Sequence, residues 1–199
     1  MKTAIFGGSF NPIHNAHVKL ASRFVDEALL DSVIFVPTFV TPLKDNSSVV
    51  SSEHRLKMCE LALKRYDSFF VSDVEIKRGG LSYSSDTIAY FKVLYPEDDL
   101  FFIMGADMFL TLEKWHEFQY IFDNVTILTA PRDDCDYDKL VKKFEYYKNK
   151  YNAKVYITKE YIEDLSSTSI RDMILSEADI SAYLDKDVVA YIVKHGLYR

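Results

Sequence analysis

Short apolar segments alternate with longer segments of helical period along the chain, and this alternation limits the fold more than any other feature. Strands are expected at residues 3–7, 32–37, 69–76, 99–105, 125–130 and 153–158. Helices are expected at residues 14–29, 51–66, 84–95, 136–151, 167–176 and 186–195. Strands that alternate with helices pair in parallel through right-handed crossovers. The sequence therefore predicts a doubly wound, Rossmann-like α/β sheet with helices on both faces.

Length and composition favour one folded domain with a substantial core. The chain has 199 residues, of which 48% are hydrophobic and 15% aromatic. We expect a single domain over residues 1–199, whose C-terminal part from about residue 160 is helical. The formal net charge of −6, without a stripe of Lys and Arg, argues against nucleic acid or an anionic membrane as a partner.

The two cysteines and the apolar segments indicate the compartment. Cys59 and Cys135 lie in no motif, which is typical of reduced thiols in a cytoplasmic protein. The chain starts on a strand-like run, and no apolar segment is long enough to span a bilayer. We expect a cytoplasmic protein that does not enter the membrane. The sequence leaves open whether it forms a homo-oligomer.

Ligands of doubly wound sheets bind at the carboxyl ends of the strands, so the segments that follow strands are the ones to consider. Gly7 and Gly8 follow the first expected strand and precede a helix. Glycine permits positive φ and close approach of a ligand, and the N-terminus of the helix attracts anions. The pattern is neither GxGxxG nor a P-loop. From these residues alone, a phosphate site and a plain tight turn are both open.

Three interpretations apply to His14 and His17, which stand three residues apart at the start of the same helix. A zinc site would need further ligands, and none lies nearby in the sequence. Capping or surface histidines are the second interpretation. In the third, both rings face the glycine segment, donate hydrogen bonds to phosphate oxygens and stabilise charge that develops during phosphoryl-type transfer.

Several motifs together resemble a known family. The segments GGSFNPIHNAH (7–17) and SSTSIR (166–171) resemble the two signatures of the nucleotidylyltransferase superfamily. The segments GGLSYSSDT (79–87), FFIMGADMFLTLEKWHEF (101–118) and HGLYR (195–199) resemble one branch, the bacterial nicotinate-mononucleotide adenylyltransferases. The motifs occur in the family's order, from residue 4 to residue 199.

The resemblance implies a reaction and the residues that bind ATP. The family joins ATP to nicotinate mononucleotide, which gives nicotinate adenine dinucleotide and pyrophosphate. The implied catalytic residues are His14, His17 and Arg171. The implied ATP-binding residues are Gly7, Gly8, Ser9, Phe10, Gly105, Asp107, Ser167, Thr168 and Arg171. Mg²⁺ is expected to be held mainly by ATP phosphates and water, because no carboxylate cluster suited to a protein metal cage is evident.

The resemblance also assigns the pyridine nucleotide. In the family a Trp that matches Trp115 stacks on the pyridine ring, although a lone Trp is more often a core residue. A hydroxyl from Ser84 or Thr87 and backbone groups near His116 would hold the nicotinate carboxylate. Lys44 and Arg132 follow strands and would complement phosphates, or else be solvated surface charges.

Departures from the family pattern keep other functions open. Ala16 replaces a glycine between the two histidines, where its methyl group would constrict the nucleotide site slightly. His116 replaces a tyrosine, and Thr41-Pro42-Leu43-Lys44 lacks a histidine that the family often has. The rival enzymes are adenylyltransferases that act on nicotinamide mononucleotide or phosphopantetheine. The rival non-enzyme is a nucleotide-binding regulator with weak turnover.

Overall fold

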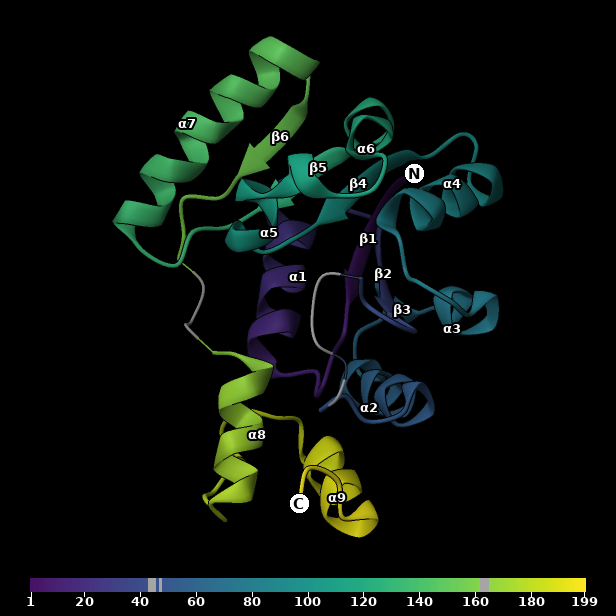
Figure 1. Ribbon diagram of the computed structural model, residues 1–199, viewed down its shortest axis with the longest axis vertical. Helices are drawn as coiled ribbons and strands as arrows, with labels where there is room; N and C mark the ends of the chain where they lie inside the picture. Colours follow the sequence, from purple (N-terminus) through teal and green to yellow (C-terminus); the bar gives the residue numbers. More distant parts are fainter. Residues whose placement is uncertain (43–45, 47, 162–164) are drawn as a thin grey trace.

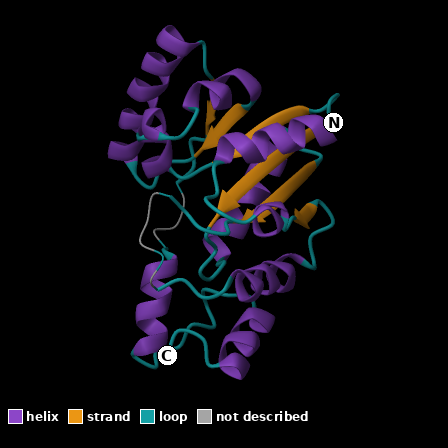
Figure 2. Cartoon of the chain, turned by 45° about the vertical axis from the view of Figure 1, so that its right-hand side comes forward, coloured by secondary structure: helices purple, strands orange, loops and turns teal. Residues whose placement is uncertain are grey.

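A parallel sheet forms the centre of the molecule (Figures 1 and 2). The computed structural model describes residues 1–42, 46, 48–161 and 165–199. The strands are β1 (Lys2–Gly8), β2 (Ser32–Pro37), β3 (Phe69–Val71), β4 (Asp99–Ile103), β5 (Thr126–Thr129) and β6 (Lys154–Ile157). They lie in the order β3-β2-β1-β4-β5-β6, and every neighbouring pair is parallel. This is the strand order of a doubly wound Rossmann-like sheet, so the predicted fold class is confirmed.

Helices of very different length connect the strands, and two more follow the last strand. They are α1 (Asn15–Ala28), α2 (Ser52–Leu63), α3 (Val74–Arg78), α4 (Ser84–Leu94), α5 (Ala106–Leu110), the 3₁₀ turn η1 (Leu112–Lys114), α6 (Phe118–Asn124), α7 (Asp134–Tyr151), α8 (Ser167–Leu175) and α9 (Lys186–His195). Helices α8 and α9 extend beyond one end of the sheet beside α2, far from α7 (Figure 1). The helices expected from periodicity are all present.

The sheet has one apolar cluster on each face, because successive residues of a strand point to opposite sides. On β1, Ala4 and Phe6 belong to the cluster shared with α1 and α2, whereas Ile5 belongs to the cluster shared with α4 to α7. The first cluster also contains Ile170 of α8 and Val188 of α9. The C-terminal helices therefore share a continuous core with the sheet.

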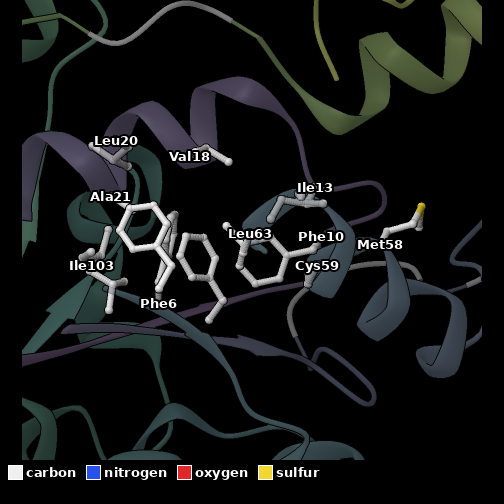
Figure 3. Packing of buried hydrophobic residues seen from close by; sticks show 14 of the residues in the cluster. Phe6, Phe10, Ile13, Val18, Leu20, Ala21, Met58, Cys59, Leu63 and Ile103 are labelled. Carbon is white, nitrogen blue, oxygen red and sulfur yellow. The ribbon is translucent and has the colours of Figure 1, made fainter. Parts of the chain in front are cut away.

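Aromatic packing joins the segment after β1 to this core. The ring of Phe6 lies 5.6 Å from that of Phe10 and 5.2 Å from that of Phe35, measured between centroids. Figure 3 shows Phe6 near Ala21 of α1, and Phe10 on the side of Ile13 and Leu63. Aromatic pairs at such distances contribute about 0.5–1.5 kcal/mol beyond their burial.

The prediction of one strand is partly wrong. Residues 69–76 were predicted as a single strand, but β3 ends at Val71 and Val74–Arg78 is the helix α3. The ladder with β2 ends where the N–H of Ser72 donates to the carbonyl of Phe35. The Ser72 hydroxyl then accepts from the N–H of Val74, 3.4 Å away, and the chain turns. The short helices α5 and α6 between β4 and β5 were not predicted.

Two further expectations from the sequence concern membrane-spanning helices and the two cysteines. Among the described residues, no helix is both long and apolar enough to cross a bilayer. Cys59 is a buried free thiol and Cys135 an exposed one. The cytoplasmic location expected from these cysteines stays a prediction.

Helix α7 holds the turn η1 through one carboxylate. Glu113 accepts hydrogen bonds from Nζ of Lys143 at 2.8 Å, from the hydroxyl of Tyr146 at 3.1 Å and from that of Tyr151 at 2.7 Å. These donors, Lys143 first, lower the pKa of Glu113 to about 2. Trp115 directly follows this turn, and its backbone N–H donates to the carbonyl of Leu112 at 3.0 Å.

We expect the contribution of Glu113 to stability to depend on acid pH. Because its folded-state pKa lies below the usual 4.5, the stabilisation is complete above about pH 4.5 and is lost as pH falls toward 2. Urea unfolding of the wild type and of Glu113→Gln measures it. The difference in free energy of unfolding between them should shrink as pH falls through this window. A difference that does not change with pH contradicts the prediction.

Candidate active site

Two pockets open at the carboxyl edge of the sheet, where β1 and β4 lie side by side. The Trp115 pocket has a volume of about 370 Å³ and is lined by Gly7, Gly8, Ser9, Thr38, Thr41, Pro42, Glu75, Ser82, Tyr83, Ser84, Met108, Lys114, Trp115 and His116. The His17 pocket has about 350 Å³; its polar and small lining residues include Asn11, His14, Ala16, His17, Gly105, Asp107, Arg132, Ser166, Ser167, Thr168 and Arg171. The segment Gly7–Ser9, with Thr41 and Met108, lines both pockets. Two ligands would therefore meet at this segment.

The segment that joins β1 to α1 shapes both pockets. Gly7 and Gly8 are the last residues of β1, and neither has positive φ; the left-handed residue is Phe10, with φ of 46°. The expected glycine turn is therefore wrong in its geometry. Gly8 has a different role, since a Cβ there would lie 3.1 Å from Cζ of Phe10, a tight contact. The ring of Phe10 folds back over the strand because Gly8 has no side chain.

The two histidines start α1 and stack on each other. His14 is the N-cap residue, and its backbone N–H donates to Nδ1 of His17 at 3.2 Å. The ring centroids are 3.7 Å apart, and the ring of Phe10 packs edge-on against His17. Because Nδ1 of His17 accepts, the proton of a neutral His17 is on Nε2. His17 thus presents an N–H donor from a ring that its neighbours hold in place.

The second signature meets the first across the pocket. Ser166 caps α8, and its hydroxyl accepts from the N–H of Ser169 at 3.0 Å. The hydroxyl of Ser167 donates to the carbonyl of Pro12 at 2.9 Å, and Nη1 of Arg171 donates to the carbonyl of Asn11 at 2.9 Å. Helix α8 begins where the sequence predicted it. Its N-terminal N–H groups and Arg171 line the His17 pocket opposite the histidines.

The turn after β4 forms another wall of the His17 pocket. Gly105 caps α5, and no atom lies within 4 Å of where its Cβ would be. Asp107 stands in the first turn of α5 and pairs with Nη2 of Arg132 at 3.0 Å. Asp107 is two residues past the N-cap residue Gly105. Arg132, predicted to serve the pyridine nucleotide, lines the His17 pocket and not the Trp115 pocket.

Aromatic rings and the start of α4 form the Trp115 pocket. Trp115 is half-buried, and its ring stands perpendicular to that of Phe102, with centroids 6.4 Å apart. The ring of His116 lies 4.2 Å from that of Tyr83, the N-cap residue of α4. Ser84, the first residue of α4, lines the pocket. The N-terminal end of this helix favours a negatively charged group there.

A buried carboxyl lies at the base of this pocket. Glu75 is 3% exposed and accepts from the hydroxyl of Thr87 at 2.6 Å. Burial raises the pKa of Glu75, so the carboxyl keeps its proton to higher pH than an exposed glutamate. Thr87, an alternative to Ser84 as a pyridine-nucleotide contact, is 1% exposed and does not line either pocket. It supports Glu75 instead.

The predictions for Ala16, for Lys44 and for a metal remain. Ala16 is 6% exposed and lines the His17 pocket, in the position where its methyl group was expected to narrow the nucleotide site. Lys44 lies outside the described residues, so the structure says nothing of its role. Among the described residues, no group of three His, Cys, Asp or Glu side chains is arranged to hold a metal ion.

Some pocket residues were missed by the sequence analysis. Asn11 lies inside the first motif, but nothing in its pattern distinguished it from a turn residue. Lys114 precedes Trp115 and lines the Trp115 pocket, so its position beside the tryptophan was an available signal. Glu75 was hidden because its segment was predicted as a strand, which gave no reason to connect it with Thr87.

Residues 5–173 match the cytidylyltransferase-like family, which is most of the chain. The chain belongs to this family. Curated relatives of similar length agree with it. A probable nicotinate-nucleotide adenylyltransferase of Carboxydothermus hydrogenoformans is 37% identical over 198 residues, which cover 100% of this chain and 98% of the relative. One of Lachnoclostridium phytofermentans is 34% identical over 197 residues, which cover 99% and 98%.

Solved structures share the fold of this family member. Nicotinic acid mononucleotide adenylyltransferase of Plasmodium falciparum, complexed with NaAD, has a TM-score of 0.76 at 21% identity, covering 100% of this chain and 98% of that one. A putative nicotinate-nucleotide adenylyltransferase of Vibrio parahaemolyticus has a TM-score of 0.71 at 21% identity, covering 100% and 96%. The resemblance inferred from the motifs is confirmed.

The open space at Gly105 leads to a prediction about nucleotide binding. Gly105→Ala adds a methyl group that meets no protein atom but enters the His17 pocket. We expect the thermal midpoint to fall only slightly, because Ala is a weaker N-cap than Gly, while the KM for ATP rises about tenfold. The KM for the second substrate is the internal control, since Gly105 does not line the Trp115 pocket. An unchanged KM for ATP contradicts the prediction.

Proposed function

We propose that the protein transfers the adenylyl group of ATP to nicotinate mononucleotide, which gives nicotinate adenine dinucleotide and pyrophosphate in NAD biosynthesis. The observation that carries the proposal is the meeting of two chemically different pockets at Gly7–Ser9. One is lined by phosphate-binding groups and the other by aromatic rings. The names of the curated relatives support the same reaction.

In this proposal ATP occupies the His17 pocket. Its β- and γ-phosphates lie against the start of α8 and Arg171, where helix N–H groups and a guanidinium attract anions. The α-phosphate lies near His14 and His17, and the Nε2–H of His17 donates a hydrogen bond to one of its oxygens. Gly105 allows the adenosine to approach the backbone, and Asp107 accepts from a ribose hydroxyl.

The chemistry needs positioning more than proton transfer. An oxygen of the nicotinate mononucleotide phosphate attacks the α-phosphorus in line, and the bond from that phosphorus to the oxygen bridging to the β-phosphate breaks. The attacking oxygen is already anionic, so no protein base is required. Pyrophosphate carries away the electron pair of the broken bond. His17 stabilises the charge that develops on the α-phosphate in the transition state.

The residues of the His17 pocket suit a Mg²⁺ ion that is bound through the substrate. A cation would be held mainly by phosphate oxygens and water, because no group of three His, Cys, Asp or Glu side chains among the described residues forms a cage for it. When bound, Mg²⁺ neutralises phosphate charge. The chain's own contribution is to align the triphosphate between α1 and α8.

The Trp115 pocket takes the pyridine ring in this proposal. The ring stacks on Trp115, and the nicotinate carboxylate lies at the start of α4, near Ser84 and the backbone at His116. Glu75 lines this pocket, and burial raises its pKa, so it ionises at higher pH than an exposed glutamate. Arg132 lines the His17 pocket and Lys114 lines the Trp115 pocket. Each would complement a phosphate of the ligand bound there.

An acceptor assay tests the proposal. The purified protein is incubated with ATP and Mg²⁺, and pyrophosphate release is followed with each acceptor in turn. We expect fast release with nicotinate mononucleotide and slower release with nicotinamide mononucleotide, because the start of α4 favours a carboxylate over an amide. Release only with phosphopantetheine would assign another branch of the family. No release with any acceptor would point to a nucleotide-binding regulator and reject the proposal.

The role of His17 leads to a separate prediction. We expect His17→Ala to keep the fold and lower kcat about 10²- to 10³-fold, the usual cost of losing one donor to a transition-state oxyanion. Steady-state kinetics and thermal unfolding measure it together. His195→Ala, the same change at an exposed histidine outside both pockets, is the matched control. An equally stable and active His17→Ala would refute the assigned role.

A further inference from the structure

Asn11 is a buried junction between segments that are far apart in the sequence. It is 3% exposed. Its Nδ2 donates to the carbonyl of Ser48 at 3.1 Å, and its Oδ1 accepts from the N–H of Val50 at 3.2 Å and from the hydroxyl of Tyr198 at 3.0 Å. Its carbonyl accepts from Arg171. One side chain thus links the first motif to the loop before α2 and to the C-terminal tail.

Arg55 of α2 holds the same segment from another side. Its side chain is 1% exposed, and its guanidinium donates to three carbonyls. Nη1 reaches Ser9 at 2.8 Å, Nε reaches Val50 at 3.1 Å and Nη2 reaches Phe39 at 3.3 Å. A buried guanidinium is stable only when its donors are satisfied, so these carbonyls and Arg55 constrain one another.

The segment between these contacts is one that needs such constraint. Phe10 has φ of 46°, a region that costs a residue with a Cβ free energy unless the surroundings enforce it. Ser9 lies before it and Asn11 after it, and these are the residues that Arg55 and Tyr198 hold. Neither Arg55 nor Tyr198 lines either pocket. Any effect of these two residues on ligands therefore passes through the residues that they hold.

We propose that Asn11, Arg55 and Tyr198 form a positioning cluster that holds Ser9–Pro12 in the conformation that binds the polyphosphate of ATP. The inference rests on the proposed function and deepens it. Burial raises the pKa of the Tyr198 phenol, so its hydroxyl keeps its proton and donates to Asn11. Small misplacements of binding groups cost reaction rate steeply, which is why residues that touch no substrate matter here.

Tyr198 and Arg55 hold different residues, and these residues lie beside different pockets. Among the described residues, the hydroxyl of Tyr198 hydrogen-bonds to Asn11 alone, and Asn11 lines the His17 pocket. Arg55 also holds Phe39, the neighbour of Thr38, which lines the Trp115 pocket. The cluster therefore predicts that loss of the Tyr198 hydroxyl affects ATP alone. Weakening of the three hydrogen bonds that the Arg55 guanidinium donates affects the binding of both substrates.

Tyr198→Phe is the decisive variant, with Tyr191→Phe as its matched control. The hydroxyl of Tyr191 on α9 lies 2.9 Å from Nδ1 of His54 on α2, so the control also removes a C-terminal hydroxyl contact, but one outside the cluster. A purely structural role for Tyr198 predicts similar losses of stability and unchanged KM values for both variants. The positioning role predicts a difference in kinetics between them.

We expect Tyr198→Phe to raise the KM for ATP about fivefold, the effect of one hydrogen bond, and to leave the KM for nicotinate mononucleotide within about twofold. Tyr191→Phe should leave both within about twofold. Arg55→Lys keeps the positive charge but loses the planar set of guanidinium donors, so it should raise both KM values. A KM for ATP in Tyr198→Phe that matches the wild type or the control overturns the proposal.

Binding separates failure of the cluster from failure of the proposed function. Calorimetry with α,β-methylene-ATP, which cannot release pyrophosphate, measures affinity without turnover. If the wild type turns over no pyridine nucleotide, the proposed function fails, and the cluster still predicts about fivefold weaker binding of the analogue by Tyr198→Phe. Equal affinity of wild type, Tyr198→Phe and Tyr191→Phe, or no binding by the wild type, rejects the cluster.

Discussion

The ring of Phe10 folds back over Gly8, and this contact sets the path of the chain between β1 and α1. A Cβ at Gly8 would lie 3.1 Å from the ring, a tight contact, and the ring packs on Phe6 and Phe35 in the core. The backbone of Phe10 is left-handed, with φ of 46°. The chain then enters α1 with the two histidine rings stacked at the edge of the His17 pocket, so the geometry of the candidate catalytic groups depends on a hydrophobic contact beneath them.

Residues from both ends of the chain complete the same pocket. The sheet brings the ends of β1 and β4 together, and the C-terminal helices pack on the core that contains β1. Ser167 and Arg171 then reach the carbonyls of Pro12 and Asn11. Because these donors act on the backbone of the first motif, the start of α8 both lines the pocket and supports its opposite wall. Partial unfolding of the C-terminal helices would therefore loosen the histidine side as well.

Much of this arrangement was predictable from local patterns. Strand and helix periods differ, so their alternation indicated a parallel doubly wound sheet, and the ends of its strands located the ligand site. The serines at residues 51 and 166 marked helix starts because their hydroxyls can cap the first turn. His14, His17 and Arg171 were identified by motif, and the fold brings them to one pocket.

Other features were decided only by contacts between distant segments. The sequence by itself determined the elements, their order and the residue types that bind phosphate, because those follow from periodicity and side-chain chemistry. The tertiary structure decided that β3 stops early, that Phe10 carries the positive φ, that Ser84 faces the Trp115 pocket while Thr87 supports Glu75, and that Tyr198 bonds to Asn11. Each of these depends on which donors and acceptors lie opposite one another after folding, and local sequence carries no information about that pairing.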